Sequence, residues 1–304
     1  MSINNKLLGI SLVLILIFTG CAPNSNTEIS SNDGKIIVSA SIMPQKYLIE
    51  RITGDQVEVN IMVGPGESPH TYEPTPGQMK ILSQSSLYFT IGVEFETIWL
   101  EKMTSVSPDM RVVHTEDGLE KIPLQDDHQH EDESGDHDED SEILDPHIWL
   151  SPDLVSIQAE SIFQAISELD PQNTETYREN LNQFQRELQE VSAQIKETLT
   201  IIEQREFIVF HPSWGYFARD FDLQQIPIEV GGSEPSPKEL AALITYAQEH
   251  NIQVIFASPT FNPKTAEIIA SEINGEVLMI DPLAENWMDN LQKVSQTFSS
   301  VLAP

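Results

Sequence analysis

Short apolar runs alternate with amphipathic stretches over two long regions of the chain. In the first region, runs rich in Val, Ile and Phe predict strands at 35–40, 57–63, 87–91 and 111–114. Segments of helical period between them predict helices at 45–53, 78–85 and 95–104. The second region shows the same alternation. Its predicted strands are at 207–210, 225–230, 254–256 and 277–280. Its predicted helices are at 214–221, 237–250, 263–273 and 287–302. Such alternation is typical of parallel α/β sheets.

Between the two regions the pattern is helical, first at 152–168 and then without a break at 174–204. The apolar positions of the longer stretch are spaced by three or four residues: Tyr177, Leu181, Phe184, Leu188, Val191, Ile195, Leu199 and Ile202. A helix of about thirty residues is about 45 Å long. We therefore expect an α/β fold with two lobes (35–172 and 206–304), each with a small parallel sheet flanked by helices, joined by one long rigid spine helix at 173–205.

The N-terminus has the pattern of an export signal at 1–20. Lys6 precedes an apolar run at 7–18 that is too short to span a bilayer comfortably. The run ends at Thr19-Gly20-Cys21, and Cys21 is the only cysteine. This segment resembles a bacterial lipoprotein signal, in which the cysteine is lipidated; an ordinary signal followed by a free thiol is the alternative. The Ser- and Asn-rich residues at 21–34 predict a flexible tether.

Charge narrows the classes of function. The chain of 304 residues has 48 Asp and Glu against 16 Lys and Arg, a net charge of −32. Nucleic-acid binding needs a positive surface, so we exclude that class. A single cysteine also excludes a cysteine-rich metal site and an internal disulfide.

Residues 125–142 differ from the rest of the chain. Ten of these eighteen are acidic, and three are His128, His130 and His137, with no apolar side chain among them. Such a segment cannot bury a core and predicts a disordered surface loop. Its histidines and carboxylates could bind metal ions weakly, or the segment could be a solvated insertion with little effect.

Four positions are candidate metal ligands: His70, His147, His211 and Asp281. They are separated by 77, 64 and 70 residues, so they form no local motif. His70, His211 and Asp281 directly follow predicted strands or strand-ending turns, where ligand sites of α/β sheets collect. Two positions belong to each lobe, so the site would lie between the lobes. Three imidazoles and a carboxylate suit Zn²⁺.

Longer strings around these positions resemble the zinc/manganese solute-binding proteins of ABC transporters (cluster A-I, zinc-uptake type). The three strings that contain the histidines span 65–76, 145–152 and 210–220. Two more matches are the string at 232–240 and Asp281-Pro282-Leu283, so the resemblance covers the whole mature chain in order.

The resemblance implies a protein, not an enzyme, that captures Zn²⁺ outside the cytoplasm and delivers it to an ABC permease and its ATPase. It implies a lipid-anchored monomer with metal between the lobes. The metal would be bound by the three histidines and by Asp281, or by water or another carboxylate in place of Asp281. Manganese members tend to have Glu where this chain has His211, which favours zinc.

Three alternatives stay open. One is a manganese-binding member of the same family, and a second is a surface adhesin or metal-storage protein of the same fold. A zinc hydrolase is the third, but the chain has neither a His-Glu-x-x-His helix motif nor a Gly-x-Ser-x-Gly elbow.

Overall fold

The computed structural model describes residues 35–125, 143–230 and 232–303. Within these ranges the first lobe has strands β1 (Ile36–Ile42), β2 (Val57–Val63), β3 (Leu87–Thr90) and β4 (Arg111–His114). All neighbouring pairs are parallel, in the order β2-β1-β3-β4. The connecting helices are α1 (Met43–Thr53), α2 (Pro76–Leu82) and α3 (Glu94–Val106).

The second lobe repeats this topology. Its strands are β5 (Glu206–Val209), β6 (Gln224–Pro227), β7 (Val254–Ala257) and β8 (Glu276–Met279), parallel throughout in the order β6-β5-β7-β8. Its connecting helices are α6 (Gly215–Asp220), α7 (Pro237–Glu249) and α8 (Lys264–Glu272). The two parallel sheets confirm the α/β fold class with two lobes that the sequence predicts.

The helices begin where the sequence supplies caps. Ser236 accepts a hydrogen bond from the main-chain N–H of Glu239 and is followed by a proline, which confirms the predicted start of α7. Ser151 caps α4 (Pro152–Leu169) in the same way, through the N–H of Leu154. The Ser151 cap fixes the chain direction four residues after the candidate ligand His147.

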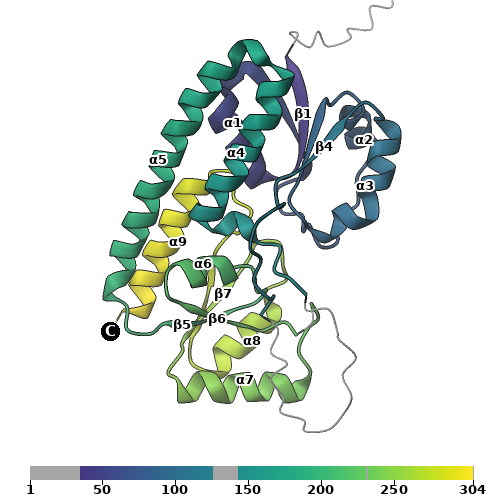
Figure 1. Cartoon of the computed structure of the whole chain (residues 1–304). Helices are drawn as coiled ribbons and strands as arrows, with labels where there is room; N and C mark the ends of the chain where they lie inside the picture. The colour runs from purple at the N-terminus through teal and green to yellow at the C-terminus, as the bar shows by residue number, and fades with distance from the viewer. Residues whose placement is uncertain (1–34, 126–142, 231, 304) are drawn as a thin grey trace, which may run out of the picture. The chain divides into compact units, whose positions relative to one another are not determined.

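A long helix, α5 (Thr174–Thr198), connects the two lobes, and a 3-10 turn (Leu199–Ile201) follows it. Its buried stripe is the one that the sequence predicts, from Tyr177 to Ile195. The helix packs against α1 of the first lobe and against α4 and α9 (Trp287–Leu302), and Figure 1 shows it beside α4 and α9. One helix therefore contacts structure from both lobes.

The apolar core divides at the second sheet. Phe207 and Val209 of β5 face a large core that runs through the first lobe, α5 and α9. Ile208 of the same strand and Phe210 face a smaller core under α7 and α8. This alternation follows from the period of two along a strand. Both faces of the second sheet are covered, so side chains that bind a ligand can be accessible only at the ends of its strands. No helix in the described ranges combines the length and apolar character that a membrane span needs.

Candidate metal centre

Three histidines meet in the connections between elements, two of them after strands. His70 lies in the connection that follows β2, and His211 comes two residues after the end of β5. His147 directly precedes a 3-10 turn, Ile148–Leu150, which leads into α4. Parallel strands end at one edge of a sheet, so the residues that follow them can face each other across the lobes.

The rings are close enough to share one ion. The ring centroids are 4.5 Å apart for His70 and His211, 5.2 Å for His147 and His211, and 5.7 Å for His70 and His147. One ligand atom from each ring lies within 4.8 Å of the other two. Tetrahedral zinc, with bonds of about 2.0–2.1 Å, places its nitrogen ligands roughly 3.4 Å apart. Side-chain adjustments of about 1 Å would close this difference.

Each histidine is hydrogen-bonded through Nδ1 to a carboxylate. The pairs are His70 with Glu94 at 2.7 Å, His147 with Asp145 at 2.7 Å and His211 with Glu229 at 2.6 Å. An ionised carboxylate only accepts hydrogen bonds, so each Nδ1 has the hydrogen and each Nε2 keeps its lone pair for a metal. Histidine ligands in metal sites are commonly oriented in this way.

The environment of His211 favours its neutral form. Burial lowers the pKa of His211 to about 4, although the hydrogen bond to Glu229 works in the opposite direction. Its Nε2 is buried and has no hydrogen-bond partner among the described residues. A buried nitrogen without a partner is costly unless a ligand uses it. Three converging imidazole nitrogens fit a borderline-soft ion such as Zn²⁺.

The three rings differ in their exposure to solvent. The side chain of His147 is 3% exposed and that of His211 is 9% exposed, whereas His70 is 21% exposed. Its partner Glu94, the first residue of α3, is 51% exposed. His70 and Glu94 therefore form the solvent side of the site.

Aromatic and apolar side chains surround the rings. The ring of Trp149 lies 5.1 Å from that of His147, and its Nε1 donates to the main-chain oxygen of Pro282 in the second lobe. Phe261 stacks on His211. These groups, with Leu283, line a small pocket around the histidines. Such walls exclude water from the bonds that a metal would form.

Asp281 is not part of this cluster of ligand atoms. It follows β8, and its carboxylate accepts from the main-chain N–H of Leu283 at 2.8 Å. It lines a neighbouring pocket of about 220 Å³, and Thr260 and Leu283 line both pockets. Burial raises the pKa of Asp281, and the hydrogen bond from Leu283 works against that rise.

Sequence reasoning missed the carboxylates that orient the histidines. Asp145 had a local signal, because it lies two residues before His147 in the same string. Glu94 and Glu229 lie 24 and 18 residues from their partners, and no spacing rule connects them. Cys21, His128, His130 and His137 lie outside the residues that the structure describes.

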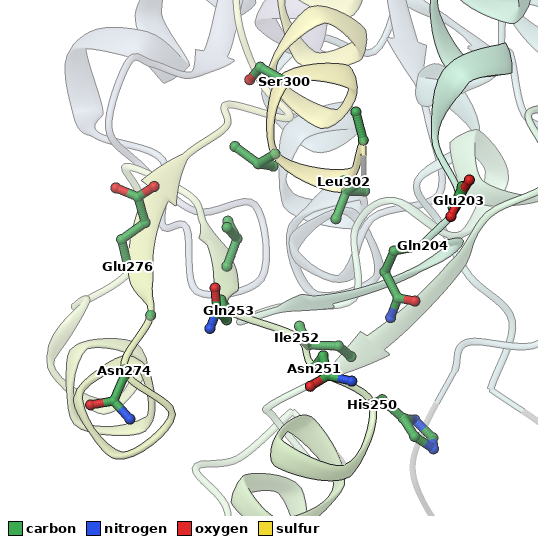
Figure 2. Close-up of a pocket in the computed structure, with 14 residues that line it drawn as sticks. Glu203, Gln204, His250, Asn251, Ile252, Gln253, Asn274, Glu276, Ser300 and Leu302 are labelled. Atoms are coloured by element: carbon green, nitrogen blue, oxygen red, sulfur yellow. The ribbon is translucent and has the colours of Figure 1, made fainter.

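Other histidines have local partners. His114 contacts Thr90 and Glu116, and His250 pairs with Glu206 at 3.1 Å. His250 also lines a larger cavity of about 810 Å³ at the amino ends of β7 and β8 (Figure 2). Six of its fourteen lining residues have amide or carboxylate side chains, and it shares no residue with the histidine cluster.

Two lobes with three inward-facing imidazoles at their strand ends define a metal-binding protein of the solute-binding class. The family described as "Zinc-uptake complex component A periplasmic" matches residues 38–301. The chain belongs to this family, ZnuA.

Individual relatives agree with this assignment. The high-affinity zinc uptake system protein ZnuA of Bacillus subtilis is 31% identical, over 92% of this chain and 88% of its own length. A manganese-binding lipoprotein, MntA of Halalkalibacterium halodurans, is 26% identical, over 96% of each chain. A zinc-bound crystal structure of a ZnuA deletion mutant has a TM-score of 0.81 and 40% identity, over 89% of this chain and 99% of that one. These relatives are binding proteins, and the chain is a binding protein rather than an enzyme.

Proposed function

We propose that this chain captures Zn²⁺ outside the cytoplasm and delivers it to an ABC importer. One observation carries the proposal: His70, His147 and His211 face each other, and each is oriented by a carboxylate through its Nδ1. Three neutral imidazoles leave the 2+ charge of the ion uncompensated. The three carboxylates behind them supply the balancing charge.

Zinc fits these donors better than manganese. The three atoms that converge are all imidazole nitrogens, whereas Mn²⁺ prefers more oxygen ligands. Manganese is the second candidate, because one relative is named as a manganese-binding lipoprotein. We propose Asp281 as the fourth donor, since its pocket shares the lining residues Thr260 and Leu283 with the pocket around the histidines. A water molecule in that position is the alternative.

We propose that a permease and its ATPase are the partners, as the family description of an uptake complex suggests. The proposed protein is a monomer anchored by lipid at Cys21, with 35–172 and 206–304 as lobes and 173–205 between them. We also keep the proposal that His128, His130 and His137 bind additional zinc weakly.

The test is competition for metal by the purified protein after its metal has been removed. We expect one tight zinc site that excess Mn²⁺ does not empty. The triple replacement of His70, His147 and His211 by Ala should abolish tight binding. Tight zinc binding by the triple variant, or preferential retention of Mn²⁺, would contradict the proposal. Asp281→Ala should weaken zinc binding if Asp281 is a ligand and leave it unchanged if water fills that position.

A further inference from the structure

A phenylalanine of the second lobe covers one of the three rings. The ring of Phe261 lies 4.9 Å from that of His211 with an interplanar angle of 23°, a stacked arrangement. Phe261 is partly buried and lines the same pocket as the three histidines. Phe261 lies in the connection between β7 and α8, which contains none of the candidate metal ligands. Its contact with His211 therefore points to a role other than metal ligation.

The sheet topology brings the two residues together. In the order β6-β5-β7-β8, β5 and β7 are neighbours, so the connections that follow them leave the sheet side by side. The pairing continues one residue beyond β5, because the N–H of Phe210 donates to the main-chain oxygen of Phe256. His211 is the next residue, and Phe261 comes from the adjacent connection.

Local hydrogen bonds fix the turn that contains Phe261. The Ser258 hydroxyl oxygen accepts from the main-chain N–H of Thr260, and its main-chain oxygen accepts from the N–H of Phe261. The two hydroxyl groups of Ser258 and Thr260 are also hydrogen-bonded, at 2.8 Å. These bonds hold Phe261 beside His211.

Two groups therefore restrain the ring of His211. Glu229 restrains it through Nδ1, and Phe261 covers one ring face. Rotation of the imidazole away from an ion would require the aromatic ring to move or would lose the stacking contact. The same ring limits the access of water to the metal–nitrogen bond.

We propose that Phe261 is a positioning residue, which holds His211 toward the ion and slows the release of bound metal. This inference rests on the proposed metal site. Displacement of the turn at 258–262 would free His211 without any change in the histidines of the first lobe. The turn is then the element through which a docked partner could speed release.

The experiment measures zinc dissociation by stopped flow, with an excess of a chromophoric chelator as the acceptor. Four forms of the full chain are compared: wild type, Phe261→Leu, Phe261→Tyr and Ile268→Ala. Leu keeps apolar volume without a ring, and Tyr keeps the ring. Ile268 is a control on the following helix, where it is 54% exposed.

We expect Phe261→Leu to release zinc about tenfold faster, as for other groups that orient ligands. Phe261→Tyr and Ile268→Ala should stay within about twofold of wild type. If Phe261→Leu does not fold by circular dichroism, Phe261→Met supplies a second side chain without a ring. A wild-type rate in the variant without a ring would overturn the proposal, and so would a fast rate in Phe261→Tyr. If wild type itself retains no zinc, the proposed function fails instead.

Discussion

Tyr216 of α6 donates its hydroxyl hydrogen to the main-chain oxygen of Asp145, 2.8 Å away, and accepts from the N–H of Ile122 at 3.2 Å. This one side chain of the second lobe therefore binds the segment that contains His147. Tyr216 is fully buried, so no water can replace its hydroxyl. The position of a first-lobe histidine thus depends on a residue of the other lobe.

Tyr216→Phe should lower both stability and zinc affinity. It leaves a buried main-chain acceptor (Asp145) and a partly buried main-chain donor (Ile122) without their partner, at a cost of about 1–3 kcal/mol in the free energy of unfolding. Urea unfolding and chelator competition measure the two effects. Tyr177→Phe is the matched control, because Tyr177 donates a similar buried bond to Asp170, away from the histidines. That variant should lose stability alone; an equal loss of zinc affinity in both would argue against the role of Tyr216.

The carboxylates behind the histidines should differ in their importance. Glu229 is 9% exposed and Glu94 is 51% exposed, so solvent screens the second much more. We expect Glu229→Gln to weaken zinc binding about 10- to 100-fold, and Glu94→Gln to have a smaller effect. Chelator competition at one pH gives both affinities. A larger loss of zinc affinity in Glu94→Gln than in Glu229→Gln would show that solvent exposure does not determine how much each carboxylate contributes to zinc binding.

Gly215 is the first residue of α6 and lies directly against Asp145. A Cβ at this position would be 2.6 Å from Asp145 Oδ2, closer than atoms can approach without movement. Since Asp145 is fully buried and orients His147, Gly215→Ala should lower the melting temperature and the zinc affinity together.

Gly77→Ala provides the comparison for this substitution. Gly77 also lies in the first turn of a helix, and its added Cβ would be 3.9 Å from the nearest atom, an ordinary contact. We expect no loss of zinc affinity there. If the two alanines had the same effect, the clash with Asp145 would not be the cause.

The sequence predicts the fold well because its signals are local. The apolar stripe of α5 and the Ser236 cap each depend on residues within a few turns, and both appear in the structure as predicted. The end of the long helix is less regular: the helical pattern runs to residue 204, but α5 ends at Thr198 and a 3-10 turn follows. Leu199 and Ile202 are still buried. At this end of the stretch, the spacing of apolar residues therefore predicts which side chains are buried but not that the backbone is α-helical.

The site is only partly readable from the sequence. Parallel strands place their following residues at one edge, which is enough to group His70 and His211 as candidates. The pairing of His211 with Glu229 needs β6 to lie beside β5, and the stacking of Phe261 needs β7 on its other side. Strand order is a tertiary property, so neither contact has a signal in the spacing of the chain.

A buried carboxyl group in the first lobe makes the stability of the protein depend on pH. Burial raises the pKa of Glu96, on α3, to about 7 from an ordinary value of 4.5. The carboxylate accepts from the hydroxyl of Ser41 and from the N–H groups of Ile91 and Gly92, which favour its charged form, but burial outweighs them. The charge of nearby Glu116 adds to the rise.

The native state therefore keeps a proton on Glu96 that the unfolded chain releases. Its contribution to stability is fully present below about pH 4.5, falls as the pH rises toward 7, and is constant above that. The loss amounts to about 3 kcal/mol across this range. Glu96→Gln cannot ionise, so relative to wild type it should gain roughly this amount between pH 5 and pH 8.

Urea unfolding of both proteins at the two pH values measures this difference. Glu101→Gln is the control, because Glu101 lies on the same helix but is exposed. Comparing variants at each pH removes the contributions of all other titrating groups, which are shared. If the difference between Glu96→Gln and wild type were the same at pH 5 and pH 8, Glu96 would be ionised in the native state throughout. The three hydrogen bonds to its carboxylate would then outweigh its burial.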